Sequence, residues 1–94
     1  MTDLKQLTED SFASAMRRNP NPRLFSVLQK IHEEFCELED VYLSVRMSAH
    51  CPELLAVEEE LADIIFSCLA FARCENIDIE KALKVKNEFN ITRL

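Results

Sequence analysis

The chain of 94 residues contains no glycine, and this absence constrains both its fold and its chemistry. Phosphate-binding loops of the Walker and Rossmann types need glycine, so both are excluded. The strong breaks are three prolines. Asn19-Pro20-Asn21-Pro22 is typical of a loop, and Cys51-Pro52 marks a second break because a residue before proline disfavours helical backbone. The segments between these breaks show no strand-like alternation, so the sequence predicts an all-α fold.

Four helices are expected from the spacing of apolar residues and from capping residues. The expected ranges are Thr8 to Arg18 with Thr8 or Asp10 as cap, Pro22 to Ser48, Pro52 to Cys74, and Asp78 to Asn90 with Asp78 as cap. The apolar stripe of the second helix extends as far as Val45. From Leu61 to Ala72 the third helix is apolar on nearly all sides, which predicts the central helix of a bundle.

Size and composition predict a single domain, residues 1–94, that associates with copies of itself. A domain this small buries only roughly 60% of the surface that its unfolded chain exposes. An apolar content of 48% is more than such a monomer can hide, so we expect a homo-oligomer, either a dimer or a tetramer. The net charge of −6 argues against a nucleic-acid partner, because backbone phosphates are bound by clustered Lys and Arg.

The sequence also carries expectations about location. The amino terminus has no basic stretch followed by an apolar one, which argues against a signal peptide. The longest nearly apolar run, Leu61 to Ala72, contains Asp63 and is too short to span a bilayer. The four cysteines match neither a CxxC redox pair nor a zinc-ligand pattern. These features predict a cytoplasmic protein with reduced thiols and no membrane partner.

Two helices carry acidic pairs at i and i+3: Glu34 with Glu37, and Glu60 with Asp63. Side chains at this spacing point only roughly 60° apart, so each pair can act as a two-pronged ligand. A short connection around Cys51-Pro52 is expected to make the two helices antiparallel neighbours, which places the two pairs at similar depth with the four carboxylates facing one another. Two carboxylates about 5 Å apart repel by roughly 3 kcal/mol at an effective dielectric of 20. A divalent cation relieves that repulsion, and an oxygen-only ligand set favours Mg²⁺ or, as a substitute, Mn²⁺.

Two other metal sites are excluded by the histidines. A di-iron carboxylate bundle needs two Glu-x-x-His motifs, but Gln29 precedes His32 and Met47 precedes His50 at that spacing. A zincin motif needs a second histidine where Cys36 stands. His32 is therefore expected at the surface or in packing rather than as a ligand.

The acidic motifs, in their order and spacing, resemble the MazG-like pyrophosphohydrolases of the all-α nucleoside triphosphate pyrophosphatase superfamily. The motifs that carry the resemblance are Glu33-Glu34-x-x-Glu37, Glu60-x-x-Asp63 and Lys86-x-x-x-Asn90-x-x-Arg93, and it spans about residues 24–93. It implies a four-helix MazG-like bundle, assembled into an oligomer, that cleaves a nucleoside triphosphate between the α and β phosphates with Mg²⁺. The expected products are a nucleoside monophosphate and pyrophosphate, in a house-cleaning role on non-canonical or excess nucleotides.

The resemblance also assigns roles to individual residues. It implies that Glu34, Glu37, Glu60 and Asp63 bind the metal, and that Lys86, Asn90 and Arg93 contact the phosphates or substrate. Glu33 and Glu34 are the expected catalytic glutamates, and whether Glu33 is an outer ligand or a base for the attacking water is left open. The alternative is a non-catalytic oligomerisation or protein-interaction module, whose carboxylates form a solvated acidic face. In that case Lys86 and Arg93 only complement the end of a helix dipole.

Overall fold

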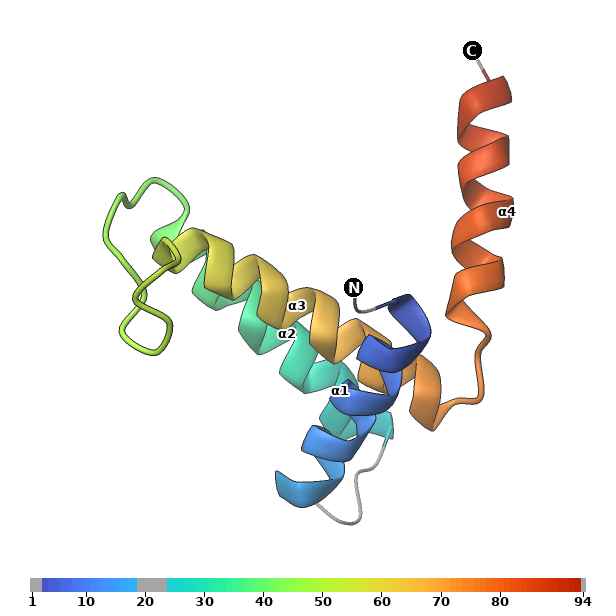
Figure 1. Ribbon diagram of the computed structural model, residues 1–94, viewed down its shortest axis with the longest axis horizontal. Helices are drawn as coiled ribbons and strands as arrows, with labels where there is room; N and C mark the ends of the chain where they lie inside the picture. Colours follow the sequence, from blue (N-terminus) through green and yellow to red (C-terminus); the bar gives the residue numbers. More distant parts are fainter. Residues whose placement is uncertain (1–2, 19–23, 94) are drawn as a thin grey trace.

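The structure, a computed structural model, describes residues 3–18 and 24–93, and this part of the chain contains four α-helices and no strand. They are α1 (Leu4–Arg18), α2 (Leu24–Val41), α3 (Ala56–Cys74) and α4 (Ile79–Thr92) (Figure 1). The all-α prediction is confirmed for this part of the chain. None of the described helices combines the length and the apolar character that crossing a bilayer requires. The expected loop at Asn19–Pro22, and the helix start at Pro22, lie outside the described residues.

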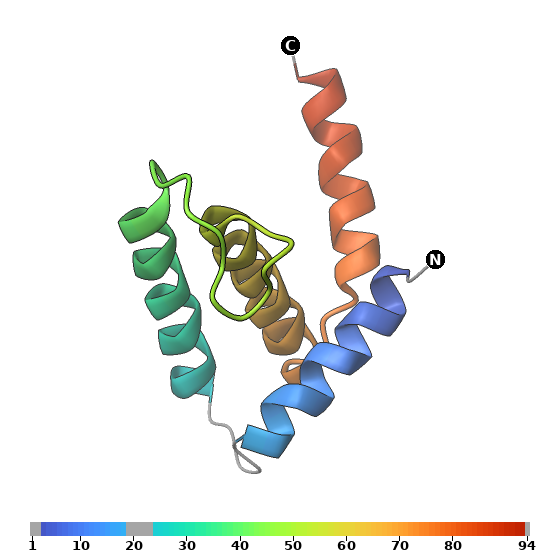
Figure 2. The ribbon, with the colours of Figure 1, turned by 60° about the vertical axis from the view of Figure 1, so that its left-hand side comes forward.

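The helix α3 lies at the centre, as its apolar stretch predicts, and packs against both α1 and α2. The helices α2 and α3 run side by side, and α1 crosses near the end of α3 that leads into α4 (Figures 1 and 2). Leu69, Ala70 and Ala72 on α3 are buried, as is Val41 at the end of α2. These contacts place one face of α2 against one face of α3, which is the arrangement that the acidic pairs require.

The fourth helix is not packed as a member of a bundle within this chain. It projects away from the other three helices, with the carboxyl end of the chain at its tip (Figures 1 and 2). Its apolar side chains at positions 83, 85, 89 and 91 are all more than half exposed. Among the described residues, three helices pack together and α4 extends from them, so the four predicted helices are present but do not form one bundle within the single chain.

Two helix starts differ from the sequence prediction. The helix α1 begins at Leu4 rather than Thr8, because the Asp3 carboxylate accepts a hydrogen bond from the backbone N–H of Gln6 (2.8 Å) and caps the first turn. Thr8 is instead a buried residue whose hydroxyl donates to the carbonyl of Leu4 (2.7 Å). The helix α3 begins at Ala56 rather than Pro52, and the Glu58 carboxylate accepts from the Leu55 N–H just before it (2.8 Å).

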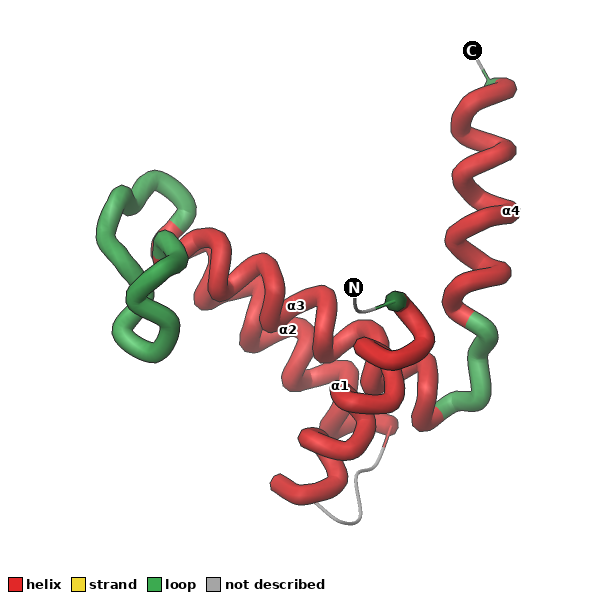
Figure 3. The backbone as a smooth tube through the Cα atoms, viewed as in Figure 1, coloured by secondary structure: helices red, strands yellow, loops and turns green. Residues whose placement is uncertain are grey.

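The second helix ends at Val41, so its expected continuation to Ser48 is wrong. Residues 42–55 form the long loop at one end of the α2–α3 pair (Figure 3). The loop folds back on itself through an antiparallel bridge between Met47 and Leu55. Tyr42 and Val45, counted in the apolar stripe, are largely exposed. The loop gives the backbone other hydrogen-bond partners, since Ser48 N–H donates to the Leu54 carbonyl (2.8 Å) and Ala56 N–H to the Arg46 carbonyl (2.9 Å).

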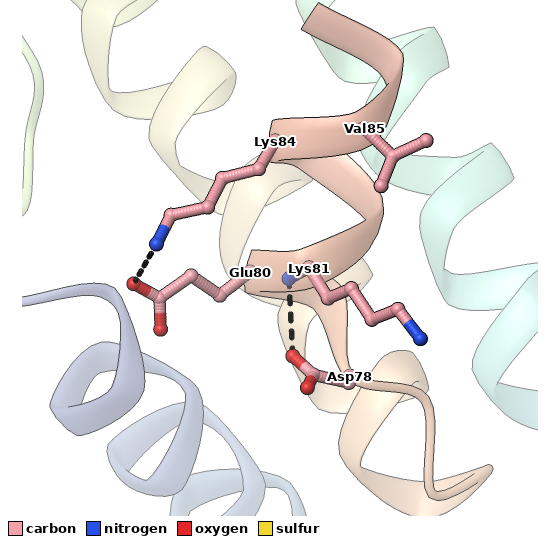
Figure 4. A pocket seen from close by; sticks show the side chains of 5 residues that line it. All are labelled: Asp78, Glu80, Lys81, Lys84 and Val85. Carbon is pink, nitrogen blue, oxygen red and sulfur yellow. Dashed lines mark hydrogen bonds and ion pairs between the residues drawn. The ribbon is translucent and has the colours of Figure 1, made fainter. Parts of the chain in front are cut away.

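The fourth helix begins as the sequence predicts. The Asp78 carboxylate accepts a hydrogen bond from the backbone N–H of Lys81 (3.1 Å), which caps the helix (Figure 4). The helix then continues to Thr92, two residues beyond the expected end at Asn90. A local capping signal was therefore sufficient to place this helix start.

Candidate metal centre

Glu34 and Glu37 lie one helical turn apart on α2. Glu34 is only 4% exposed, which is unusual for a carboxylate, because burying a charge without compensation is costly. Its Oε1 is 2.6 Å from the ammonium of Lys30, whereas its buried Oε2 has no hydrogen-bond partner among the described residues. A buried carboxylate oxygen that lacks a partner has the free lone pairs that a cation would use.

Glu60 on α3 completes a cluster of three carboxylates. One carboxylate oxygen from each of Glu34, Glu37 and Glu60 can be chosen so that all three lie within 4.8 Å of one another. Glu60 Oε2 is also buried and has no partner in the described part of the chain. Asp63, one turn further along α3, lines the same cleft but lies outside this three-carboxylate cluster. The structure thus brings together three of the four predicted metal ligands and places the fourth beside them.

The proximity of these carboxylates changes their acid–base chemistry. The pKa of Glu60 is raised from 4.5 to about 7, first by burial, then by a hydrogen bond with Glu37 and by the negative charges of Glu37, Asp63 and Glu34. The pKa of Asp63 is also raised, first by burial and then by the charges of Glu34 and Glu59. Both shifts have the same physical basis: burial and the mutual repulsion of the carboxylates outweigh the ammonium of Lys30, which contacts Glu34.

The carboxylates line one wall of a cleft of about 870 Å³. Glu33 lines it as well, so all five acidic residues predicted for the site face one hollow. The cleft extends from the α2–α3 face to α1, where Ser11, Ser14 and Arg18 line it. Its volume lies in the range typical of small-molecule sites. The helix α1, which had no predicted role, therefore forms a wall of the candidate site.

The loop of residues 42–55 supplies a group that sequence reasoning did not assign to the site. Ser48 is buried and donates a hydrogen bond to Glu59, while its hydroxyl accepts from the N–H groups of His50 (3.1 Å) and Cys51 (3.0 Å). His50 Nδ1 lies 3.2 Å from the other Glu59 oxygen, and His50 and Glu59 both line the cleft. Nothing in the spacing of these three residues predicts that they meet, because the meeting depends on the path of the loop.

The three residues predicted to contact phosphate are not brought to the cleft within this chain. Lys86, Asn90 and Arg93 lie on α4 or at its end, are exposed, and do not line the cleft. The Lys86 ammonium lies 4.6 Å from the centre of the Phe89 ring, and the Arg93 guanidinium 5.9 Å from it. His32 is exposed, as predicted, with Nε2 3.8 Å from the Cys36 sulfur.

A smaller hollow of about 380 Å³ lies at the start of α4, lined by residues from Asp78 to Val85 (Figure 4). It is formed by a single helix and its cap. Asp78 caps the helix, and Lys84 Nζ lies 3.7 Å from a Glu80 oxygen, so both carboxylates of this hollow have a partner. The α2–α3 cleft, with its unpartnered carboxylate oxygens, is therefore the candidate site.

Comparison of the chain with models of protein families, with curated proteins and with solved structures found no match in any of the three.

Proposed function

We propose that the chain is a Mg²⁺-dependent nucleoside triphosphate pyrophosphohydrolase that cleaves the α–β phosphoanhydride, releasing a nucleoside monophosphate and pyrophosphate. The observation that carries this proposal is the buried Glu34 Oε2, which has no partner among the described residues and belongs to the cluster with Glu37 and Glu60. The reaction type and the house-cleaning role come from the motif resemblance of the sequence to the MazG-like pyrophosphohydrolases.

The donor set fits Mg²⁺ or Mn²⁺ better than other metals. Its members are carboxylate oxygens, which are the ligands that these hard cations prefer, and neither histidine nor thiolate belongs to the three-carboxylate cluster. Glu34, Glu37 and Glu60 would hold the ion, and Asp63 would join them from the same side of the cleft. When bound, Mg²⁺ would neutralise phosphate charge and lower the pKa of a coordinated water.

The other residues of the cleft support the same reaction. Glu33 is exposed and lines the cleft next to Glu34, so it can accept a proton from water or hold the water of a metal ion through a hydrogen bond. The cleft is large enough for a nucleotide, and Lys30 and Arg18 on its lining add positive charge that can contact phosphate oxygens. The base and sugar that fit are not determined by these features.

Lys86, Asn90 and Arg93 would contact phosphate only if a second copy of the chain brought α4 to the cleft. Two observations favour association. The helix α4 projects from its own chain with its apolar residues exposed, and Leu61 and Ile65 on α3 are about half exposed. Exposed apolar surface of this extent is typical of an interface between copies. We therefore propose a dimer or a tetramer as the working form.

The same exposed apolar residues also favour the second candidate, a non-catalytic oligomerisation or interaction module. The two candidates differ in what they require of the carboxylates. An interaction module has no use for Glu34 as a buried carboxylate with an unpartnered oxygen, whereas a metal site depends on it. For this reason we favour the enzyme.

Pyrophosphate release tests the proposed activity. Standard, oxidised and methylated nucleoside triphosphates are incubated with the protein and Mg²⁺, and both products are identified. We expect pyrophosphate and a nucleoside monophosphate from at least one substrate, with loss of the activity in EDTA and in Glu60→Gln. Release of inorganic phosphate instead, or no release from any substrate with Mg²⁺ or Mn²⁺, would contradict the proposal.

A further inference from the structure

Lys30 lies one helical turn before Glu34 on α2, and its ammonium is 2.6 Å from Glu34 Oε1. The two partners differ sharply in burial: the Glu34 side chain is 6% exposed and the Lys30 side chain 46%. Lys30 also lines the cleft that contains the carboxylates. The ion pair thus joins a buried carboxylate of the cluster to a half-exposed cation that can reach the cleft.

This pair compensates charge inside the carboxylate cluster. Among the ion pairs of the described residues, only the pair of Lys30 with Glu34 includes a member of the three-carboxylate cluster. A buried carboxylate without a partner is strongly destabilising, so an ammonium on Glu34 stabilises the protein when no metal is present.

A divalent cation on Glu34 would compete with this ammonium. Both are positive, both interact with the same carboxylate, and an ammonium has no lone pair with which to bind a metal. Two like charges at such short range repel strongly in a partly buried site. The Lys30 side chain is long and half-exposed, so its ammonium can move away from Glu34 into solvent at little cost in free energy.

We propose that Lys30 is an exchangeable counter-ion of the site. It neutralises Glu34 in the metal-free protein, leaves Glu34 when a divalent cation binds, and then contacts a phosphate oxygen of the ligand in the cleft. This inference rests on the proposed function, because it assumes a metal and a phosphate ligand. It assigns to Lys30 two successive anionic partners, one in each state of the site.

A second ion pair of the same spacing provides a matched control. Lys84 and Glu80 on α4 are also four residues apart, with Nζ and Oε1 separated by 3.7 Å (Figure 4). Both of these side chains are more than half exposed, and the pair lies outside the carboxylate cleft. Lys84→Met removes the same charge from the same kind of helix pair without touching the candidate site.

The test compares the wild type with Lys30→Met, Lys30→Arg and Lys84→Met by calorimetry. The first titration uses Mg²⁺ alone, and the second uses inorganic pyrophosphate at saturating Mg²⁺. We expect Lys30→Met to bind Mg²⁺ about tenfold more tightly, because the competing ammonium is gone, and pyrophosphate about tenfold more weakly. Lys30→Arg should bind Mg²⁺ more weakly than the wild type, because a guanidinium holds a carboxylate through two hydrogen bonds. Lys84→Met should match the wild type.

The results that would overturn the Lys30 exchange differ from those that would overturn the proposed metal site. Unchanged or weaker Mg²⁺ binding by Lys30→Met, or unchanged pyrophosphate binding, would overturn the exchange while leaving the proposed metal site in place. If Lys30→Met fails to fold, the Arg variant decides, since Mg²⁺ binding equal to or tighter than that of the wild type would overturn the proposal. A wild type that binds no Mg²⁺ would overturn the proposed function together with this inference.

Discussion

At the scale of single residues, the buried carboxylates act against the stability of the metal-free protein. Glu34 and Glu60 each keep one buried oxygen without a partner among the described residues, and Glu60 is repelled by three neighbouring carboxylates. Such an arrangement costs free energy of folding unless a cation binds to it. Because this cost opposes folding, protonating or removing one of these carboxylates should stabilise the metal-free protein.

The first prediction concerns how the stability of the metal-free protein depends on pH. Glu60 titrates near 4.5 when unfolded and near 7 when folded, so between these pH values the folded state binds more protons. The stability of the metal-free protein should therefore fall as pH rises from about 4.5 to about 7, and rise again on acidification. Urea unfolding in EDTA across this range measures the slope. Glu60→Gln should reduce the slope, and an unchanged slope in that variant would show that Glu60 is not its source.

The second concerns Asp63, whose pKa is raised by burial and by the charges of Glu34 and Glu59. Asp63→Asn removes a desolvated and repelled charge, so the metal-free protein should melt a few degrees higher. Asp40→Asn is the matched control, because Asp40 is exposed on α2 and does not line the cleft. Thermal melts of both variants in EDTA compare them. A lower melting temperature for Asp63→Asn than for Asp40→Asn would indicate that Asp63 stabilises the fold.

At the scale of elements, the loop of residues 42–55 holds one end of the α2–α3 pair. Ser48 joins the loop to α3 through Glu59, and its hydroxyl accepts from two loop N–H groups. Ser48→Ala leaves these groups without a side-chain partner and should destabilise the protein by about 1 to 3 kcal/mol. Ser44→Ala removes a hydroxyl that accepts one hydrogen bond, from the backbone N–H of Arg46, and should destabilise the protein less. Equal midpoints in urea for the two variants would contradict the role of Ser48.

Some helices and contacts of this fold have a local sequence signal, and others do not. Helical period and the Asp78 cap were sufficient to predict the all-α class and the start of α4, because both signals are local. The i, i+3 spacing was sufficient to place Glu34, Glu37 and Glu60 together once α2 and α3 were neighbours. The end of α2 was missed, because Tyr42 and Val45 continue the apolar period although the backbone there pairs within a loop. The contact between Ser48, His50 and Glu59 depends on that loop and has no local signal.

At the scale of the whole molecule, α4 projects from the three packed helices of the described residues, and its apolar side chains at positions 83, 85, 89 and 91 are more than half exposed. We expect sedimentation to show a dimer or a tetramer at micromolar concentration. Leu83→Asp should shift the protein toward the monomer if the apolar residues of α4 form the interface, since a buried charge in an interface is costly. Asn87→Asp adds the same charge at an exposed polar position of the same helix and should leave the oligomer intact. A monomeric wild type would contradict the proposed assembly.

The central claim is that Glu34, Glu37, Glu60 and Asp63 form a site for a divalent cation. Glu37 and Glu39 are both exposed glutamates of α2, but Glu37 belongs to the carboxylate cluster and lines the cleft, whereas Glu39 does neither. Replacing either by glutamine makes the same chemical change, so a difference between the variants reports the site itself.

Calorimetric titration of Mg²⁺ into the metal-free wild type, Glu37→Gln and Glu39→Gln measures this difference most directly. We predict that the wild type and Glu39→Gln bind Mg²⁺ with equal affinity and gain thermal stability from it, while Glu37→Gln binds at least about tenfold more weakly and gains little. If Glu37→Gln and Glu39→Gln bind Mg²⁺ alike, or if the wild type gives no binding heat and no stabilisation, the four-carboxylate site is wrong.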